Sequence, residues 1–169
     1  MSSIRVLQDK ETAVKIGEFL TGPDAFEQTW APNEKTCVKQ AVLDSLDGKN
    51  HRYWYVENAG QIIAALGVRE NKLGSGGYEM DSDYVAVHKD FRRRGIANEL
   101  LKAMEKYVTE NNGRYIHIVT CDIPSYQPAN QFYESNNYTR VAEMPDYFVP
   151  GEGRIDYYKL FQTETSTLT

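Results

Sequence analysis

The hydrophobic pattern of the N-terminal part of the chain predicts one strand and two helices. Apolar and polar residues alternate over residues 3–7, as they do in a strand with one buried face. From Glu11 to Leu20 the apolar residues follow helical spacing, and Asp9 stands before them as a candidate cap. Helical spacing returns between Asn33 and Leu46 and ends at Asp47-Gly48. This part is therefore expected to fold as strand, helix and helix.

The middle of the chain carries the pattern of strands. His51–Glu57 is rich in aromatic and β-branched residues, and Gln61–Val68 is a second apolar run. The turn residues Asn58-Ala59-Gly60 separate the two runs, which indicates a β-hairpin. After a flexible connection, Tyr78–Val87 is expected to be the third strand of this meander.

The strongest helical pattern follows. Apolar residues recur every four positions from Ile96 to Val108, and Asn-Asn-Gly at 111–113 ends the repeat. The next apolar run, Tyr115–Cys121, has the length and composition of a buried strand. Strand, crossover helix and strand form a βαβ unit, so we expect Tyr78–Val87 and Tyr115–Cys121 to run parallel.

The C-terminal pattern completes an α+β fold. A short helix is expected at Pro128–Ser135, followed by a strand pair, Tyr138–Ala142 and Arg154–Leu160. The whole pattern predicts a mixed, mostly antiparallel sheet of six to seven strands with one parallel pair, flanked by about four helices. A length of 169 residues suits a single domain, expected over residues 1–161 and followed by a polar tail at 162–169.

Composition narrows the class of protein. Apolar residues make up 41% and charged residues 25%, and no apolar run is long enough to cross a membrane. The first residues lack the apolar core of a secretion signal, and there are only two cysteines, so a reduced, cytoplasmic protein is expected. The three histidines have no partners at ligand spacing, so no metal site is predicted. A net charge of -5 disfavours nucleic acid as a partner.

The stretch Phe-Arg-Arg-Arg-Gly at 91–95 places three arginines just before the predicted helix. A helix N-terminus already carries positive partial charge and free N–H groups, so this crowding favours a bound anion. Gly95 lacks a Cβ and lets a ligand approach the backbone. The alternative is a solvated run of charges with Gly95 as an ordinary turn residue. Neither a Walker A loop nor a dinucleotide fingerprint is present.

Two segments in the second half of the chain resemble the GNAT acetyltransferases. Residues 85–97 resemble that family's pattern Gln/Arg-x-x-Gly-x-Gly/Ala after an apolar strand end, with Arg92, Gly95 and Ala97 at its defined positions. Ala129–Tyr138 resembles the family's Ala-x-x-x-Tyr-x-x-x-Gly-Phe/Tyr segment. The first half agrees with the family in the order of its elements.

The resemblance implies acetyl-CoA as the acyl donor and no metal. Its pyrophosphate would lie on the amides of Arg93 to Asn98, and its pantetheine arm on the backbone of the third strand, where that strand splays from its parallel neighbour. The implied cofactor-binding residues are Val85, Ala86, Val87, Arg92, Arg93, Arg94, Gly95, Ile96, Ala97, Asn98 and Tyr133.

Acetyl transfer to an amine needs a general base for the amine and a general acid for the leaving thiolate. The resemblance assigns the acid to Tyr133, and the alternative is a tyrosine packed in the core. Glu79, Asp81 and Asp83 alternate along one predicted strand, so they share a face until a bulge intervenes. Alignment on Gly95 favours Asp81 as the base. A solvated acidic face with water as the base is equally compatible with the sequence.

Several positions depart from the family pattern or stay open. Tyr126 stands where the family often has the asparagine that binds pantetheine; Ser125 or Asn130 could replace it, or the contact is lost. Asn137 replaces a glycine and tolerates the same left-handed conformation. Cys121 is either a nucleophile or a small buried residue, and the latter is expected because no base accompanies it.

The resulting hypothesis is an N-acetyltransferase that moves an acetyl group from acetyl-CoA to a primary amine by direct transfer in a ternary complex. The acceptor is a small molecule or peptide, and the acidic residues favour a cationic amine. Tyr147, Phe148 and the loop at 150–153 are expected to border its site. The alternatives are a non-catalytic acyl-CoA-binding regulatory module and a nucleotide-phosphate binder. A homodimer remains open.

Overall fold

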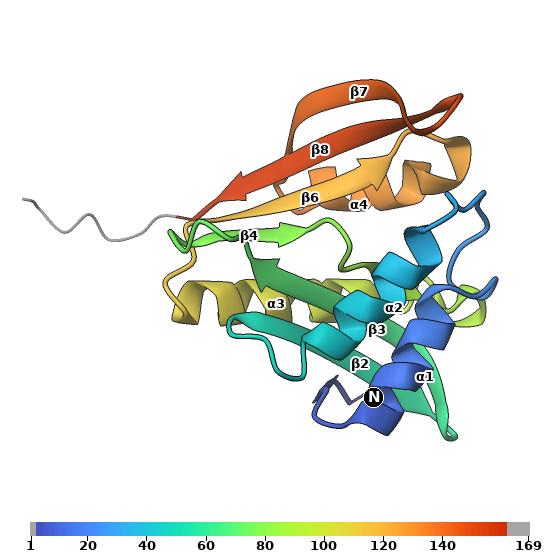
Figure 1. Cartoon of the computed structure of the whole chain (residues 1–169), viewed down its shortest axis with the longest axis vertical. Coiled ribbons are helices and arrows are strands. Elements are labelled where there is room, and N and C mark those ends of the chain that lie inside the picture. The colour runs from blue at the N-terminus through green and yellow to red at the C-terminus, as the bar shows by residue number, and fades with distance from the viewer. Residues whose placement is uncertain (1–2, 162–169) are drawn as a thin grey trace, which may run out of the picture. The chain divides into compact units, whose positions relative to one another are not determined.

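A computed structural model describes residues 3–161 and contains four α-helices and eight strands within them (Figure 1). Backbone contacts divide the chain into two compact units. The first holds the residues up to Arg69 together with Met80–Met104, and the second holds Glu70–Glu79 together with the residues from Glu105 onward. The predicted tail at 162–169 lies outside the described residues. No helix in the described part is long and apolar enough to cross a membrane.

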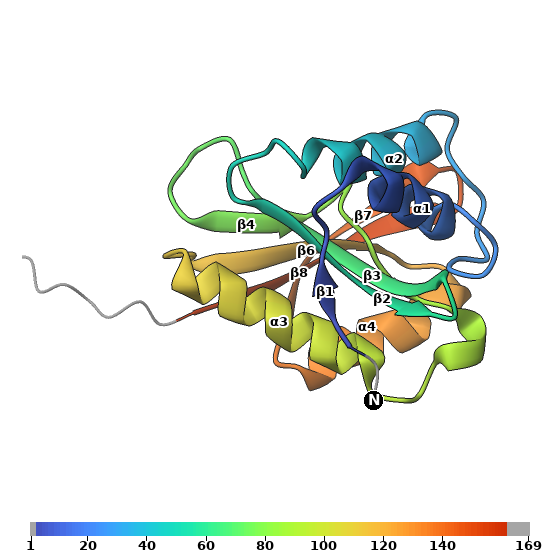
Figure 2. The same ribbon diagram turned by 90° about the horizontal axis from the view of Figure 1, so that it is seen from below.

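The helices of the first unit form where the periodicity predicts them. Helix α1 spans Lys10–Leu20, and the side chain of Asp9 caps it by accepting a hydrogen bond from the Thr12 amide at 2.8 Å. Helix α2 spans Glu34–Asp44. Figure 2 shows both helices on one face of the strands of this unit and the start of α3 on the other. The apolar faces of α1 and α2 pack into one buried core with the strands. This core includes Ala13, Ile16, Leu20, Val38, Val42, Tyr53, Tyr55, Ile62 and Ala65.

Four strands of the first unit pair antiparallel. Strand β1 (Arg5–Val6) pairs with β2 (His51–Asn58), and β2 pairs with β3 (Gln61–Glu70) in the predicted hairpin. Ala59 and Gly60 make the hairpin turn with φ of 51° and 78°. Strand β5 (Val85–Val87) pairs with β3.

The second unit orders its strands β4-β6-β8-β7, with ranges Gly77–Met80, Tyr115–Cys121, Glu152–Leu160 and Thr139–Val149. Strand β8 is antiparallel to both β6 and β7. The arrows of β4 and β6 point the same way in Figure 1, so the predicted parallel pair is confirmed. Helix α4 spans Gln127–Ser135, close to its predicted bounds.

Helix α3 (Ile96–Glu110) continues from the first unit into the second. Its buried apolar residues are those of the predicted repeat, Ile96, Leu100, Met104 and Val108, together with Leu101 and Tyr107. The helix ends as predicted, with Asn112 at φ 61° and the Gly113 amide donating to the Val108 carbonyl at 2.7 Å.

The predicted strand Tyr78–Val87 is divided in the structure. Strand β4 ends at Met80, residues 81–84 form a bend, and β5 begins at Val85. Within the bend, the side chain of Asp83 turns into the interior, where it is buried. Asp81 stays exposed. Glu79, Asp81 and Asp83 were expected to share one face only until a bulge intervened, and the bend at residues 81–84 is that interruption. The division accounts for the eighth strand.

Candidate active site

The arginine–glycine turn leads into α3 through an unusual backbone. A short 3-10 turn, Lys89–Phe91, precedes it, and Arg93 and Gly95 then adopt positive φ values of 64° and 80°. The first intrahelical hydrogen bond of α3 runs from the Glu99 amide to the Gly95 carbonyl at 3.1 Å. By helix geometry, the three amides of residues 96–98 therefore have no intrahelical partner. A Cβ added at Gly95 would meet no atom within 4 Å, so the turn faces open space that an anion can occupy.

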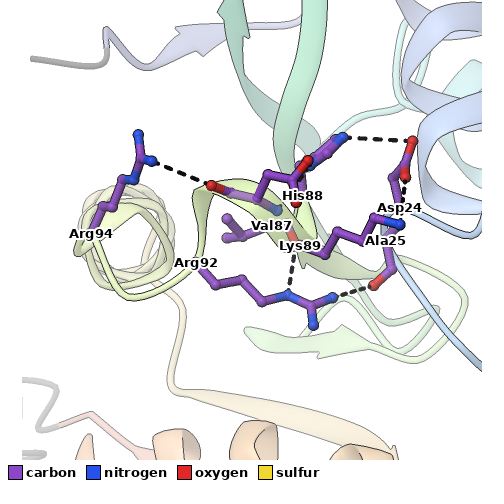
Figure 3. Close-up of polar contacts among 8 residues, drawn as sticks. Asp24, Ala25, Val87, His88, Lys89, Arg92 and Arg94 are labelled. Carbon is purple, nitrogen blue, oxygen red and sulfur yellow. Dashed lines mark hydrogen bonds and ion pairs between the residues drawn. The ribbon is translucent and has the colours of Figure 1, made fainter.

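Two of the three arginines contact carbonyl groups of the protein itself. Figure 3 shows the guanidinium of Arg92 donating to the Val87 carbonyl at 3.1 Å and to the Ala25 carbonyl at 2.9 Å. Arg94 donates to the Asp90 carbonyl at 3.3 Å and lies over the Phe91 ring. These bonds brace the turn. Cofactor binding by the arginines stays a prediction, and the contact of Arg92 with Ala25, 67 positions away, has no signal in the sequence.

His88 joins the same turn to the loop after α1. Its ring is buried, and its Nδ1 accepts a hydrogen bond from the Asp90 amide at 3.1 Å. Its Nε2 lies 3.5 Å from a carboxylate oxygen of Asp24 (Figure 3). The Lys89 amide donates to the Asp24 carbonyl at 2.9 Å. No local pattern in the sequence points to a role for His88 or Asp24, because their pairing depends on which loops become neighbours.

Strand β5 presents an open backbone edge. The His88 amide donates to the Ile63 carbonyl at 2.7 Å, and the Gly67 amide donates to the Tyr84 carbonyl at 3.2 Å. In an antiparallel pair the hydrogen-bonded positions alternate, so the backbone groups of Val85 and Val87 point away from β3. The Val87 carbonyl accepts from Arg92. The remaining polar groups on this edge can pair with an amide-bearing chain as an added strand would.

Tyr133 lies on α4, in the second unit, and is 5% exposed. The rings of Phe132, Tyr138 and Tyr157 surround it at centroid distances of 5.7 to 6.2 Å. Burial, with a smaller contribution from Tyr157, raises the pKa of Tyr133 far above its ordinary value. The hydroxyl is therefore protonated at neutral pH, as a general acid must be before it acts. Burial in an aromatic cluster fits equally well the alternative that Tyr133 is a tyrosine packed in the core.

The three candidate carboxylates differ in their surroundings. Asp81 is exposed, Glu79 is half-buried and Asp83 is buried. Burial pushes the pKa of Asp83 up, but hydrogen bonds from His51 and Arg69 and their charges outweigh it, so the net pKa lies below its usual range. A buried carboxylate that holds its charge so firmly is a poor proton acceptor. Asp81 is thus the candidate base that is exposed to solvent.

The end of β6 holds two residues whose roles the sequence left open, Asn130 and Cys121. Asn130 accepts a hydrogen bond from the Thr120 hydroxyl at 2.9 Å and donates to the Cys121 carbonyl at 3.1 Å. Its amide therefore holds the strand end to α4. Cys121 is buried, and burial raises the pKa of its thiol, which disfavours a nucleophilic thiolate.

An open hollow of about 440 Å³ lies beside α4 in the second unit. Its walls come from α4, the 122–124 loop and β8, and include Gln127, Asn130, Gln131, Glu134, Ile155 and Tyr157. The Tyr157 hydroxyl donates to Glu134 at 2.9 Å within it. Tyr133 is not among the lining residues, so the hollow lies on a different side of α4 from the candidate acid.

The sequence model of the GNAT acetyltransferase domain matches residues 49–140, more than half of the chain. The chain belongs to the GNAT family. The matched residues of this GNAT chain include the arginine–glycine turn and Tyr133. Membership confirms the expected class of acetyltransferase. No match was found among curated proteins.

Solved structures share the GNAT fold over nearly the whole chain. A GNAT-family protein from Desulfovibrio desulfuricans has a TM-score of 0.77 at 18% identity, covering 95% of this chain and 99% of its own. The ribosomal-protein-S18-alanine N-acetyltransferase of Escherichia coli has a TM-score of 0.75 at 14% identity, covering 100% and 99%. An aminoglycoside 6'-N-acetyltransferase complexed with coenzyme A has a TM-score of 0.69 at 15% identity, covering 94% and 98%. At such identities the likeness shows the fold alone.

Proposed function

We propose that the protein is an N-acetyltransferase that moves an acetyl group from acetyl-CoA to a primary amine of a small molecule or peptide. The observation that carries this proposal is the turn at 92–95, where a glycine with positive φ opens onto free space at the unpaired amides of α3. The membership of the GNAT family and the coenzyme A complex of a similar structure support it.

The chain offers binding surfaces that suit two polar parts of the donor, its pyrophosphate and its pantetheine arm. The amides of Arg93 to Asn98 suit the pyrophosphate, because they combine free N–H groups with the positive end of the helix dipole. The open edge of Val85–Val87 suits the two amides of the pantetheine arm. Arg92 and Arg94 support this surface by bracing the turn.

The transfer is direct in this proposal. The neutral amine attacks the thioester carbonyl carbon, the new C–N bond forms and the C–S bond breaks. Asp81 takes the amine proton, either directly or through a water molecule, and the Tyr133 hydroxyl gives its proton to the leaving thiolate. The raised pKa of Cys121 supports a mechanism without an acetyl-cysteine intermediate.

The acceptor is proposed to be cationic before it loses its proton. Exposed Asp81 supports this choice, as does the net charge of -5. Two structures of the same fold belong to enzymes named for amine acceptors, an alanine of a ribosomal protein and aminoglycosides. A cytoplasmic site of action is part of the proposal.

The variant Tyr133→Phe tests the catalytic assignment. Thiol release from acetyl-CoA should be followed with a panel of amines, including a polyamine, an aminoglycoside and an N-terminal alanine peptide. We expect turnover to fall by about 10²-fold or more, because the general acid is lost, while the Kd of acetyl-CoA stays within about threefold.

Tyr138→Phe is the matched control, since it also removes one hydroxyl from the same aromatic cluster but should keep turnover. If the wild-type protein binds acetyl-CoA and releases no thiol with any amine, the non-catalytic binding module replaces this proposal.

A further inference from the structure

The bend between β4 and β5 contains a buried charged cluster that the proposed chemistry does not use. The Asp83 carboxylate is 0% exposed. One of its oxygens lies 2.8 Å from His51 Nε2, and the other accepts a hydrogen bond from Arg69 Nε at 2.5 Å. His51 and Arg69 are direct cross-strand partners on β2 and β3. A single carboxylate therefore bridges two neighbouring strands and ties the bend to both.

Stability alone does not explain this arrangement. Removing a carboxylate from water is costly, and buried ion pairs are often no more stabilising than apolar groups of the same volume. What such a cluster supplies is one defined position, because displacement of any member leaves an unpaired buried charge. The function to explain is therefore the placement of the bend.

The backbone and side chains around Asp83 hold the bend in the same place. Gly67 donates its amide to the Tyr84 carbonyl at 3.2 Å, and the Tyr53 ring occupies the space where a side chain on Gly67 would lie. The Tyr84 hydroxyl donates to Glu34 of α2 at 2.7 Å. The segment around Asp83 is thus anchored to β3 and to α2 as well as through its carboxylate.

The bend joins the two parts of the candidate site in the first unit. Asp81, the proposed base, lies two residues before Asp83, and Val85, the start of the open edge of β5, lies two residues after it. A shift of the bend therefore moves both.

We propose that Asp83 is a positioning residue, which with His51 and Arg69 locks the bend and so sets the open edge of β5 and the carboxylate of Asp81 in register for acetyl-CoA and the amine. The effect of this lock on catalysis rests on the proposed function. The lock itself is a property of the fold and can be tested without any ligand.

The test is Asp83→Asn. Asparagine is isosteric, and its amide can accept from Arg69 and donate to a neutral His51, so this variant should fold. Amide hydrogen exchange of residues 84–88 should become at least about tenfold faster, the effect of losing one charged hydrogen bond. The Kd of acetyl-CoA by calorimetry, well below the Tm of the variant, should rise by a similar factor, and kcat should fall with it.

Asp156→Asn is the matched control. Asp156 also pairs with a histidine and an arginine, His117 at 3.0 Å and Arg154 at 2.6 Å, but it lies on β8. This variant should leave the exchange of residues 84–88 and the Kd of acetyl-CoA unchanged. Arg69→Gln serves as the second test variant if Asp83→Asn does not fold, because it keeps the pair of Asp83 with His51.

The outcomes separate the two proposals. The lock would be overturned if Asp83→Asn kept the wild-type rate of amide exchange at residues 84–88 and the wild-type Kd of acetyl-CoA. A lower Tm with both of these values unchanged would have the same meaning. If the wild-type protein does not bind acetyl-CoA, the proposed function fails and the exchange rates alone decide whether the lock exists.

Discussion

The guanidinium of Arg92 donates to two carbonyl groups, Val87 and Ala25, that are far apart in the sequence. The role of Asp83 also depends on residues far away in the sequence. Its neighbours along the chain are exposed or half-buried, whereas its hydrogen-bond partners come from β2 and β3. For a single residue, the side-chain type limits the chemistry that is possible, and the partners supplied by the fold determine which role it has.

The lowered pKa of Asp83 predicts acid-sensitive stability. A carboxylate whose native pKa lies below its unfolded value, about 3.9, stabilises the fold fully above that value. The free energy of unfolding should therefore fall as the pH drops from about 4 through the native pKa. Urea unfolding of wild type and Asp83→Asn between about pH 3 and 6 measures this.

The variant should lose less stability on acidification than wild type does. Asp156 and Asp9 also have a lowered pKa, so a residual slope of the same sign is expected in Asp83→Asn. Equal slopes in the two proteins would show that Asp83 does not hold its charge in the native state as described.

At the scale of elements, the start of α3 combines strain with open space. Gly95 has φ 80°, which a residue with a Cβ adopts only at a cost, and nothing packs against the position where that Cβ would lie. The conformation therefore serves the turn and the access to its amides rather than packing.

Gly95→Ala should weaken acetyl-CoA binding more than it weakens the fold. The left-handed backbone costs about 1–2 kcal/mol with a Cβ. The added methyl group also enters the space above the amides, so the Kd of acetyl-CoA should rise at least about tenfold. Calorimetric titration and thermal unfolding measure the two effects.

Gly60→Ala provides the control for backbone strain. Gly60 has φ 78° in the β2–β3 turn, and an added Cβ there also meets no atom within 4 Å. It should lose a similar amount of stability and keep the affinity for acetyl-CoA. An equal loss of affinity in both variants would mean that strain, and not occupancy of the turn, explains the effect.

For the molecule as a whole, the GNAT fold supplies the expectation that a coenzyme A thioester binds the native state. The two units contain different parts of the proposed machinery: the turn and Asp81 belong to the first, and Tyr133 belongs to the second. Binding of a ligand to the native state alone raises the stability of the chain by mass action.

Acetyl-CoA at about 100 times its Kd should raise the free energy of unfolding by about 2.7 kcal/mol. For a chain of this size that corresponds to a rise in Tm of about 5–10 °C, measured by differential scanning calorimetry. ATP and NAD at the same concentration are the comparison. A rise with either of them that matches or exceeds the rise with acetyl-CoA would favour a nucleotide-phosphate binder.

Local patterns in the sequence located the helices, most strands and the candidate anion-binding turn. Periods of 3.6 and 2 in the apolar residues are local signals, and they located α1 to α4 and most strands to within a few residues. Glycine at 95 and the charges before it are also local, and so is the spacing that led to Tyr133.

The partners of polar side chains and the interruption of the strand at 81–84 became visible only in the tertiary structure. The acidic residues alternate from Glu79 to Asp83 without a local sign of a break, so only the burial of Asp83 between β2 and β3 shows where the strand is interrupted. The bond from Arg92 to Ala25 and the contact of His88 with Asp24 likewise appear only when loops far apart in the chain meet. A charged or polar side chain forms its hydrogen bonds with whichever partner the fold brings within reach. That partner can be far away in the sequence, so the residues next to the side chain do not identify it.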